Sequence, residues 1–187
     1  MTKQNGNPNN DDFIRQGSSY NITCSETIPR FDAASDLAIA ATGVVQSVGI
    51  PLQVGDLVTN LTFVTGATAA GTPTAGFVAL YSPAGVLLGQ SADFGSTARA
   101  ANTAYSIALA TPVLITTAGL YYAAISFTAT TVPTLRGASV LNAVMAGAVV
   151  STMKILSQSH GSAVGATAPA TIATPTTTFA IPYMVAT

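Results

Sequence analysis

From Leu37 to the C-terminus the chain is a series of short runs rich in Val, Ile, Thr, Tyr and Phe, separated by turns of Gly, Pro and Ala. Helical periodicity is mostly absent, and no helical segments alternate with these runs as a parallel sheet would require. The spacing of about eight or nine runs is typical of antiparallel sandwiches. We therefore expect an all-β fold, an antiparallel jelly-roll-like β-sandwich of about eight strands.

The clearest strands lie in the first half of this region. Asp56 to Thr65 alternates imperfectly between apolar and polar side chains, which predicts a strand with one buried face. Gly76 to Ser82 and Val86 to Ser91 flank Pro83-Ala84-Gly85, where proline fixes φ and glycine can take a positive φ. These two runs should form a hairpin.

A second group of strands follows. Ala104 to Leu109 and Val113 to Thr116 lead through a Thr-Ala-Gly turn into Leu120 to Thr128. Side chains in the last run alternate between two faces. We expect three of them to point into the core and Tyr122, which has the opposite phase, to be exposed; the three inward residues are Tyr121, Ile125 and Phe127.

The last third of the chain is less regular. Ser139 to Leu156 fits a short helix or strands, and both readings stay open. Gly161 to Thr178 has few large side chains, so it should lie extended over the domain or over a neighbour. Phe179 to Val185 is predicted to be a closing strand.

Charge is distributed very unevenly. Eight of the thirteen charged residues lie in the first 36 positions, and only 7% of the chain is charged. Soluble domains are about one quarter charged and stay dispersed partly through that charge. A surface this poor in charge favours permanent contact with other subunits, so we expect a homo-oligomer.

The polar N-terminal part is predicted to be an extended docking arm, residues 1–36, preceding a β-sandwich domain, residues 37–187. Residues 1 to about 19 are dominated by Asn, Gln, Asp, Gly and Ser and cannot form a core of their own. Sparse apolar side chains offer anchors for a partner's groove, and these are Phe13, Ile14, Tyr20, Ile22, Ile28 and Phe31.

Composition disfavours several classes of partner. The net charge of −1 and the absence of Lys or Arg runs argue against nucleic-acid binding. The most apolar stretches are interrupted within about 17–19 residues, so no membrane insertion is expected. The N-terminus lacks the apolar stretch of a secretory signal, and the lone Cys24 forms no disulfide framework within the chain.

Candidate catalytic groups are few. Asp56 and Asp93 follow turns, where their carboxylates are expected to cap backbone N–H groups. His160 is the only histidine and is expected to lie in a loop of small residues, Ser-Gln-Ser-His-Gly-Ser, without a nearby carboxylate. A structural or exposed histidine is therefore expected. We expect no catalytic residue, no cofactor and no metal site, and therefore no enzyme.

Four phrases stand out between Pro51 and Gly137, and they are Val-Gly-Asp-Leu-Val-Thr-Asn-Leu-Thr-Phe-Val, Phe-Val-Ala-Leu-Tyr-Ser, Ala-Gly-Leu-Tyr-Tyr and Val-Pro-Thr-Leu-Arg-Gly. Through these phrases the segment resembles accessory virion proteins of tailed phages infecting actinobacteria, usually called minor tail proteins. These phrases are structural β phrases without a catalytic motif. The resemblance implies a β-sandwich on a phage particle, working in assembly or host attachment without a cofactor.

The expectation that follows is a non-enzymatic structural protein of the virion, as a minor tail or capsid-decoration component. Its partners would be other virion structural proteins. The alternative is a glycan-binding attachment module at the tail tip, which would stack a host surface glycan on exposed aromatic rings. Tyr122 is the candidate surface contact for that role.

Overall fold

The computed structural model describes residues 15–16, 24–140, 145 and 147–187. These residues form three antiparallel sheets and one short 3-10 helix, η2 (Arg30–Asp32). Sheet A contains, in spatial order, β1 (Arg15–Gln16), β2 (Cys24–Glu26), β14 (Met184–Ala186), β5 (Leu57–Val64) and β8 (Ala104–Leu114). Sheet B contains β13 (Ala180–Pro182), β10 (Leu135–Ser139) and β3 (Ser35–Leu37). Sheet C contains β12 (Thr176–Thr177), β11 (Ser157–His160), β4 (Val45–Leu52), β9 (Gly119–Thr128), β6 (Ala75–Tyr81) and β7 (Leu87–Gln90).

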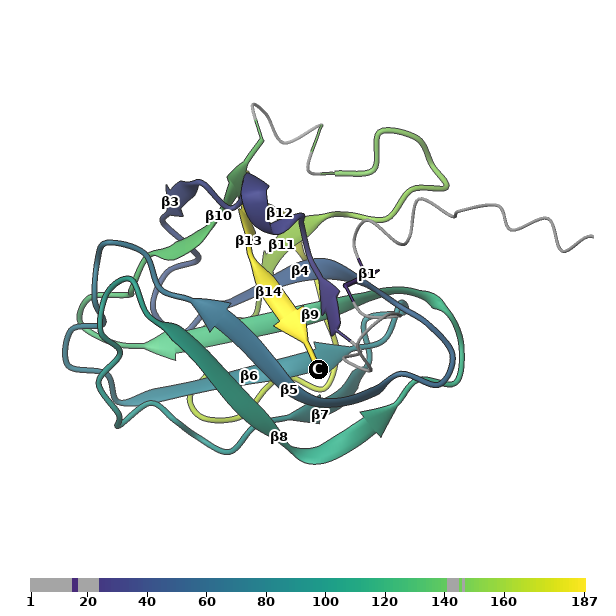
Figure 1. Cartoon of the computed structure of the whole chain (residues 1–187). Helices are drawn as coiled ribbons and strands as arrows, with labels where there is room; N and C mark the ends of the chain where they lie inside the picture. Colours follow the sequence, from purple (N-terminus) through teal and green to yellow (C-terminus); the bar gives the residue numbers. More distant parts are fainter. Residues whose placement is uncertain (1–14, 17–23, 141–144, 146) are drawn as a thin grey trace, which may run out of the picture.

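The predicted all-β antiparallel sandwich is confirmed. Strands β5, β8 and β14 cross over β9 and β6, so sheets A and C form two layers (Figure 1). Every strand pair in the described residues is antiparallel. The described part holds more strands than the eight expected, because several pairings span only two to four residues. The jelly-roll connectivity stays a prediction.

Most long strands lie where the sequence placed them. The hairpin of β6 and β7 turns through Gly85, which has a φ of 77°, and the Gly85 N–H donates to the Ser82 carbonyl at 2.8 Å. The two strands expected around Pro112 are instead the single strand β8. Val58 pairs with Val113 and Asn60 with Ala108, so Pro112 falls at a register shift in the ladder, where its missing N–H breaks no pairing.

The predicted closing strand is divided between two sheets. Residues 180–182 are β13 of sheet B and residues 184–186 are β14 of sheet A, so the chain passes from one sheet to the other at Tyr183. Val185 also pairs with Glu26, and β3 pairs with β10. Strands β2 and β3 are therefore part of the folded sheets, although they lie within the segment expected to be the docking arm.

The main core fills the space between sheets A and C. Its largest fully buried side chains come from both layers, with Phe63 on β5, Ile125 and Phe127 on β9, and Met184 on β14. The rings of Phe63 and Phe127 meet edge to face, with centroids 5.8 Å apart. Tyr121 is also buried here, so the inward placement of Tyr121, Ile125 and Phe127 is confirmed.

A second apolar cluster covers the other face of sheet C. Residues 161–178, which we call the strap, run along this face and bond to it through backbone pairs such as Leu87 N–H to the Ala170 carbonyl at 2.9 Å. The cluster comprises Val45, Phe77, Ala79, Tyr81, Tyr122, Ala124 and Ala168, with Val164 and Ile172 packed against it. The expectation that Gly161 to Thr178 lies extended over the domain is confirmed.

The strap corrects the prediction for Tyr122. This side chain is only 6% exposed and packs in the second cluster, so it is not a surface contact. Its phase opposite to Tyr121 was assigned correctly, but the strap converts the face that would have been exposed into a second buried face. Burial also raises the pKa of Tyr122.

Candidate functional site

The predicted arm anchors are only partly within the described residues. Phe13, Ile14, Tyr20 and Ile22 lie outside them. Ile28 is partly buried and packs against the main core of its own chain. Phe31, on η2, is 71% exposed and keeps the accessibility that a docking residue needs.

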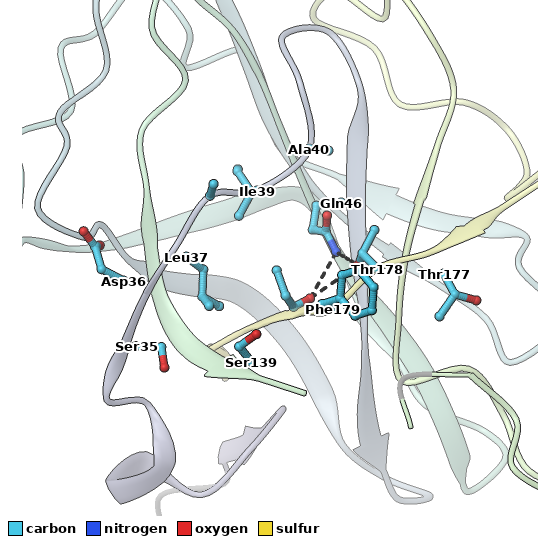
Figure 2. A pocket seen from close by; sticks show the side chains of 12 residues that line it. Ser35, Asp36, Leu37, Ile39, Ala40, Gln46, Ser139, Thr177, Thr178 and Phe179 are labelled. Carbon is cyan, nitrogen blue, oxygen red and sulfur yellow. Dashed lines mark hydrogen bonds between the residues drawn. The ribbon is translucent and has the colours of Figure 1, made fainter. Parts of the chain in front are cut away.

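The largest groove described lies between residues 35–40 and residues 177–180 and has a volume of about 760 Å³. Figure 2 shows the segment Ser35 to Ala40 on one side, Thr177 to Phe179 on the other, and Gln46 between them. Hydroxyl groups of Ser35, Ser139, Thr177 and Thr178 line it. Phe179 also lines it and is 52% exposed.

Gln46 is the buried polar group of this groove. Its Nε2 donates to Thr178 Oγ1 at 2.7 Å (Figure 2). It also donates to Ser157 Oγ at 2.7 Å. Ser157 Oγ in turn donates its proton to the Ala180 carbonyl. The Ser157 hydroxyl therefore acts as an acceptor toward Gln46, which fixes the orientation of the Gln46 amide. The Gln46 Oε1 is left buried without a hydrogen-bond partner among the described residues. A buried acceptor of this kind costs free energy unless a donor reaches it.

His160 lies on β11, not in the loop that the sequence suggested. Its Nε2 is 2.8 Å from Ser47 Oγ, and its ring meets Tyr81 edge to face at 5.4 Å between centroids. His160 is 4% exposed and Ser47 is fully buried. Burial lowers the pKa of His160 to about 4. His160 also lines a groove of about 400 Å³ together with residues of the strap. The buried Ser47 and the edge-to-face contact with Tyr81 fit a structural histidine.

Asp56 and Asp93 cap turns, as predicted. Asp56 Oδ2 accepts from the Gln53 N–H at 2.8 Å. Asp93 Oδ1 accepts from the N–H groups of Gly76 and Gly95 at 2.9 and 2.8 Å. Both carboxylates thus satisfy backbone donors next to a strand end. Within the described residues, no three His, Cys, Asp or Glu side chains lie close enough to hold a metal ion.

A second groove, which we call the arginine groove, lies on the outer face of sheet A and has a volume of about 440 Å³. Thr62 and Val64 of β5, Ala104 of β8 and Val185 of β14 form its uncharged floor. Their strand neighbours Leu61, Phe63 and Met184 point into the core, so these residues face outward. The remaining lining residues are Arg30, Ala33, Arg136 and Tyr183.

One side of the arginine groove is held by a buried hydrogen-bonded cluster. Tyr183 donates to Glu26 Oε1 at 2.7 Å, and Arg30 donates through Nη2 to the same oxygen at 3.0 Å and through Nε to the Tyr183 hydroxyl at 3.2 Å. Glu26 is 1% exposed, whereas the Arg30 side chain is 63% exposed. Burial raises the pKa of Tyr183 to about 12, and the bonds to Tyr183 and Glu26 raise the pKa of Arg30.

Arg136 stands at the other side of the arginine groove. Its Nη2 donates to Asn102 Oδ1 at 2.7 Å. Within the described part of the chain it forms no ion pair, and Asp36 is the carboxylate that it influences from a distance. The pKa of Asp36 is lowered mainly by the Ala67 N–H, then by Thr134 and by Arg136. The groove therefore combines an apolar floor with guanidinium groups on two sides.

Sequence reasoning missed both grooves. Their linings come from segments more than 100 residues apart, such as Arg30 with Tyr183 and Gln46 with Thr178. No local pattern marks these pairs. One sequence signal could have pointed to the arginine groove, and it is the isolated charge of Arg136 in a nearly uncharged domain.

Comparison with known proteins gave no match to a family model, a curated protein or a solved structure. None of the helical segments in the described residues has the length and apolar character that a membrane crossing requires.

Proposed function

We propose that this chain is a non-enzymatic structural component of a tailed-phage virion, as a minor tail or capsid-decoration protein. It would dock through its N-terminal arm and display the β-sandwich to like subunits or outward. The resemblance of Pro51 to Gly137 to minor tail proteins supports the phage setting. The observation that carries the structural role is the outer face of sheet A, which has no charged residue on β5 or β8.

Exposed apolar side chains support the same role. Leu57 and Leu114 are directly opposite each other on β5 and β8 and are 53% and 59% exposed. Val54, in the turn before β5, is 65% exposed. Apolar groups that gather at one end of an uncharged sheet favour a subunit contact.

The experiment is removal of residues 1–23, the part of the arm that precedes β2. Because β2 and β3 are retained, the truncated chain should keep its cooperative melting and β-type circular dichroism. We expect it to be lost from virions, since the docking segment is gone. Truncated protein that enters particles at normal copy number would show that attachment uses the sandwich alone. Particles labelled on the intact chain would locate it on the tail or on the capsid.

The second candidate function is a glycan-binding attachment module. The groove of Figure 2 favours it, since hydroxyl groups line a wide opening beside the exposed ring of Phe179. An exposed ring next to hydroxyls suits stacking and hydrogen bonding to a sugar. Binding of actinobacterial cell-wall polysaccharide by the isolated chain, abolished by Phe179→Ala, would favour this module over the scaffold.

A further inference from the structure

We propose that the arginine groove of one copy binds residues Asp11–Ile14 of a second copy. This inference rests on the proposed function, in which the arm docks on a neighbour, and it names the receiving surface. In the bound pair, the carboxylates of Asp11 and Asp12 face Arg30 and Arg136, and the side chains of Phe13 and Ile14 lie on the floor between β5, β8 and β14.

Charge complementarity is the first argument. Arg30 and Arg136 line the groove, while its floor of Thr62, Val64, Ala104 and Val185 is uncharged. Arg30 forms an ion pair with Glu26, whereas Arg136 has no ion-pair partner among the described residues. A fitting ligand therefore has acidic groups next to apolar groups.

The chain itself contains such a segment. Asp11-Asp12-Phe13-Ile14 is the only place where two adjacent carboxylates occur, and two large apolar residues follow directly. Asp56 is also followed at once by two apolar side chains, Leu57 and Val58, but Val58 is buried in the core of its own chain and the Asp56 carboxylate caps a turn.

The distance that residues 11–14 can extend from β1 decides whether they occupy the groove of their own copy or of a second copy. The floor strands β5 and β8 are three and four strand positions from β1 in sheet A. At about 4.8 Å for each position these distances are roughly 14 and 19 Å. Phe13 lies two residues before Arg15 and can extend only about 7 Å from it. The segment is too short to reach β5 and β8 of its own groove, and only Val185 of β14, two positions or roughly 10 Å from β1, lies near it. The occupant of the whole floor is therefore a second copy.

A charge swap tests the pairing in the full-length chain. We expect Asp11→Arg with Asp12→Arg to weaken self-association about tenfold, because like charges then meet across the groove. Arg136→Asp should weaken it similarly, and the combined chain should recover most of the wild-type affinity. Sedimentation velocity measures the self-association of the two single-site groups of variants and of the combined chain against the wild type. Arg136 is chosen because Arg30 also holds Glu26 and Tyr183 inside the fold.

Lys154→Asp is the matched control. Lys154 is exposed and lies outside the groove, so its replacement changes the net charge as Arg136→Asp does but leaves the groove lining intact. It should leave self-association unchanged. A wild-type chain that stays monomeric at about 100 µM, or a swap that fails to recover affinity, overturns the proposal.

A crosslink distinguishes a second copy from the same copy. With Cys24 replaced by serine, Phe13→Cys and Ala104→Cys should form a disulfide between chains on oxidation, seen as a dimer or ladder on a non-reducing gel. A disulfide within one chain, or none, contradicts the proposal. If the truncation abolishes virion incorporation while the swap and the crosslink fail, the arm docks elsewhere, and the proposed function survives without this groove.

Discussion

Sheets A and C are built from similar apolar sequences, but they differ in what covers their outer faces. In sheet C, the strap packs over β6 and β9, so consecutive residues of β9 from Tyr121 to Phe127 are all buried. In sheet A, the outward residues of β8, among them Ala104 and Ala108, are exposed. Strands β6 and β9 of sheet C and strands β5 and β8 of sheet A all lack charged residues, but for two different reasons. In sheet C the lack of charge is required by burial within the chain, and in sheet A it fits burial by a partner.

The largest expected effect comes from placing the same charge on the two outer faces. Ala124 of β9 is fully buried beneath the strap, so Ala124→Asp puts an unpaired carboxylate in an apolar cluster. That costs several kcal/mol against a total stability of about 5–15 kcal/mol. We expect this variant to be largely unfolded in thermal melts followed by circular dichroism.

Ala108→Asp is the matched control on sheet A. Ala108 is exposed on β8, and surface substitutions usually change stability by less than about 0.5 kcal/mol. The isolated chain should melt as the wild type does, while its self-association weakens if sheet A is a contact surface. Equal stability of the two variants would mean that the strap does not bury sheet C.

Acid should weaken sheet C specifically, through His160. The pKa of His160 is about 4 in the folded chain and 6.5 in the unfolded one. Between pH 6.5 and 4 the imidazole is therefore protonated in the unfolded state but neutral in the folded state, which favours unfolding. Stability is complete above pH 6.5 and falls by about 3 kcal/mol as the pH drops to 4. The physical cause is desolvation, and the buried Nδ1 has no acceptor among the described residues.

Urea unfolding of the wild type and His160→Asn between pH 4 and 7 measures this loss. The substitution leaves every acidic residue in place, so the difference between the two curves isolates His160. The difference should change steeply between pH 6.5 and 4. Parallel curves would show that the imidazole is solvated and that the strap opens readily at this position.

The sequence was most informative where a structural feature is local. The strand β5, the hairpin of β6 and β7, and the capping by Asp56 and Asp93 each depend on a few neighbouring residues, and all were predicted. The strap was also predicted, because a segment of Ala, Thr, Pro and Gly cannot form its own core. What was not predictable is which face it covers, and hence the burial of Tyr122.

The sites escaped prediction for the same reason. The Glu26 and Tyr183 side chains are 157 residues apart in sequence, and Gln46 meets Thr178 across 132 residues. A pairing of this kind is decided by sheet topology, which periodicity does not encode. His160 was assigned to a loop because Ser-Gln-Ser-His shows no apolar alternation, although β11 pairs with β4 along its whole length. A polar strand such as β11 can be recognised only when the strand with which it pairs is known.

The smallest expected effect compares one tyrosine hydroxyl in each sheet. Tyr183 donates to the buried carboxylate of Glu26 at 2.7 Å, whereas Tyr121 of sheet C donates to the neutral Thr117 carbonyl at the same distance. Hydrogen bonds to charged groups contribute about 1.5–3 kcal/mol and neutral ones about 0.5–1.5 kcal/mol. Tyr183→Phe should therefore cost more free energy of unfolding than Tyr121→Phe at pH 7. The cost of Tyr183→Phe should also shrink as the pH rises from 10 to 12, because the raised pKa of Tyr183 lets only the unfolded wild type lose its proton in that range. Equal costs for the two variants in urea unfolding would mean that Arg30 alone satisfies Glu26, and that this side of the arginine groove does not depend on the tyrosine.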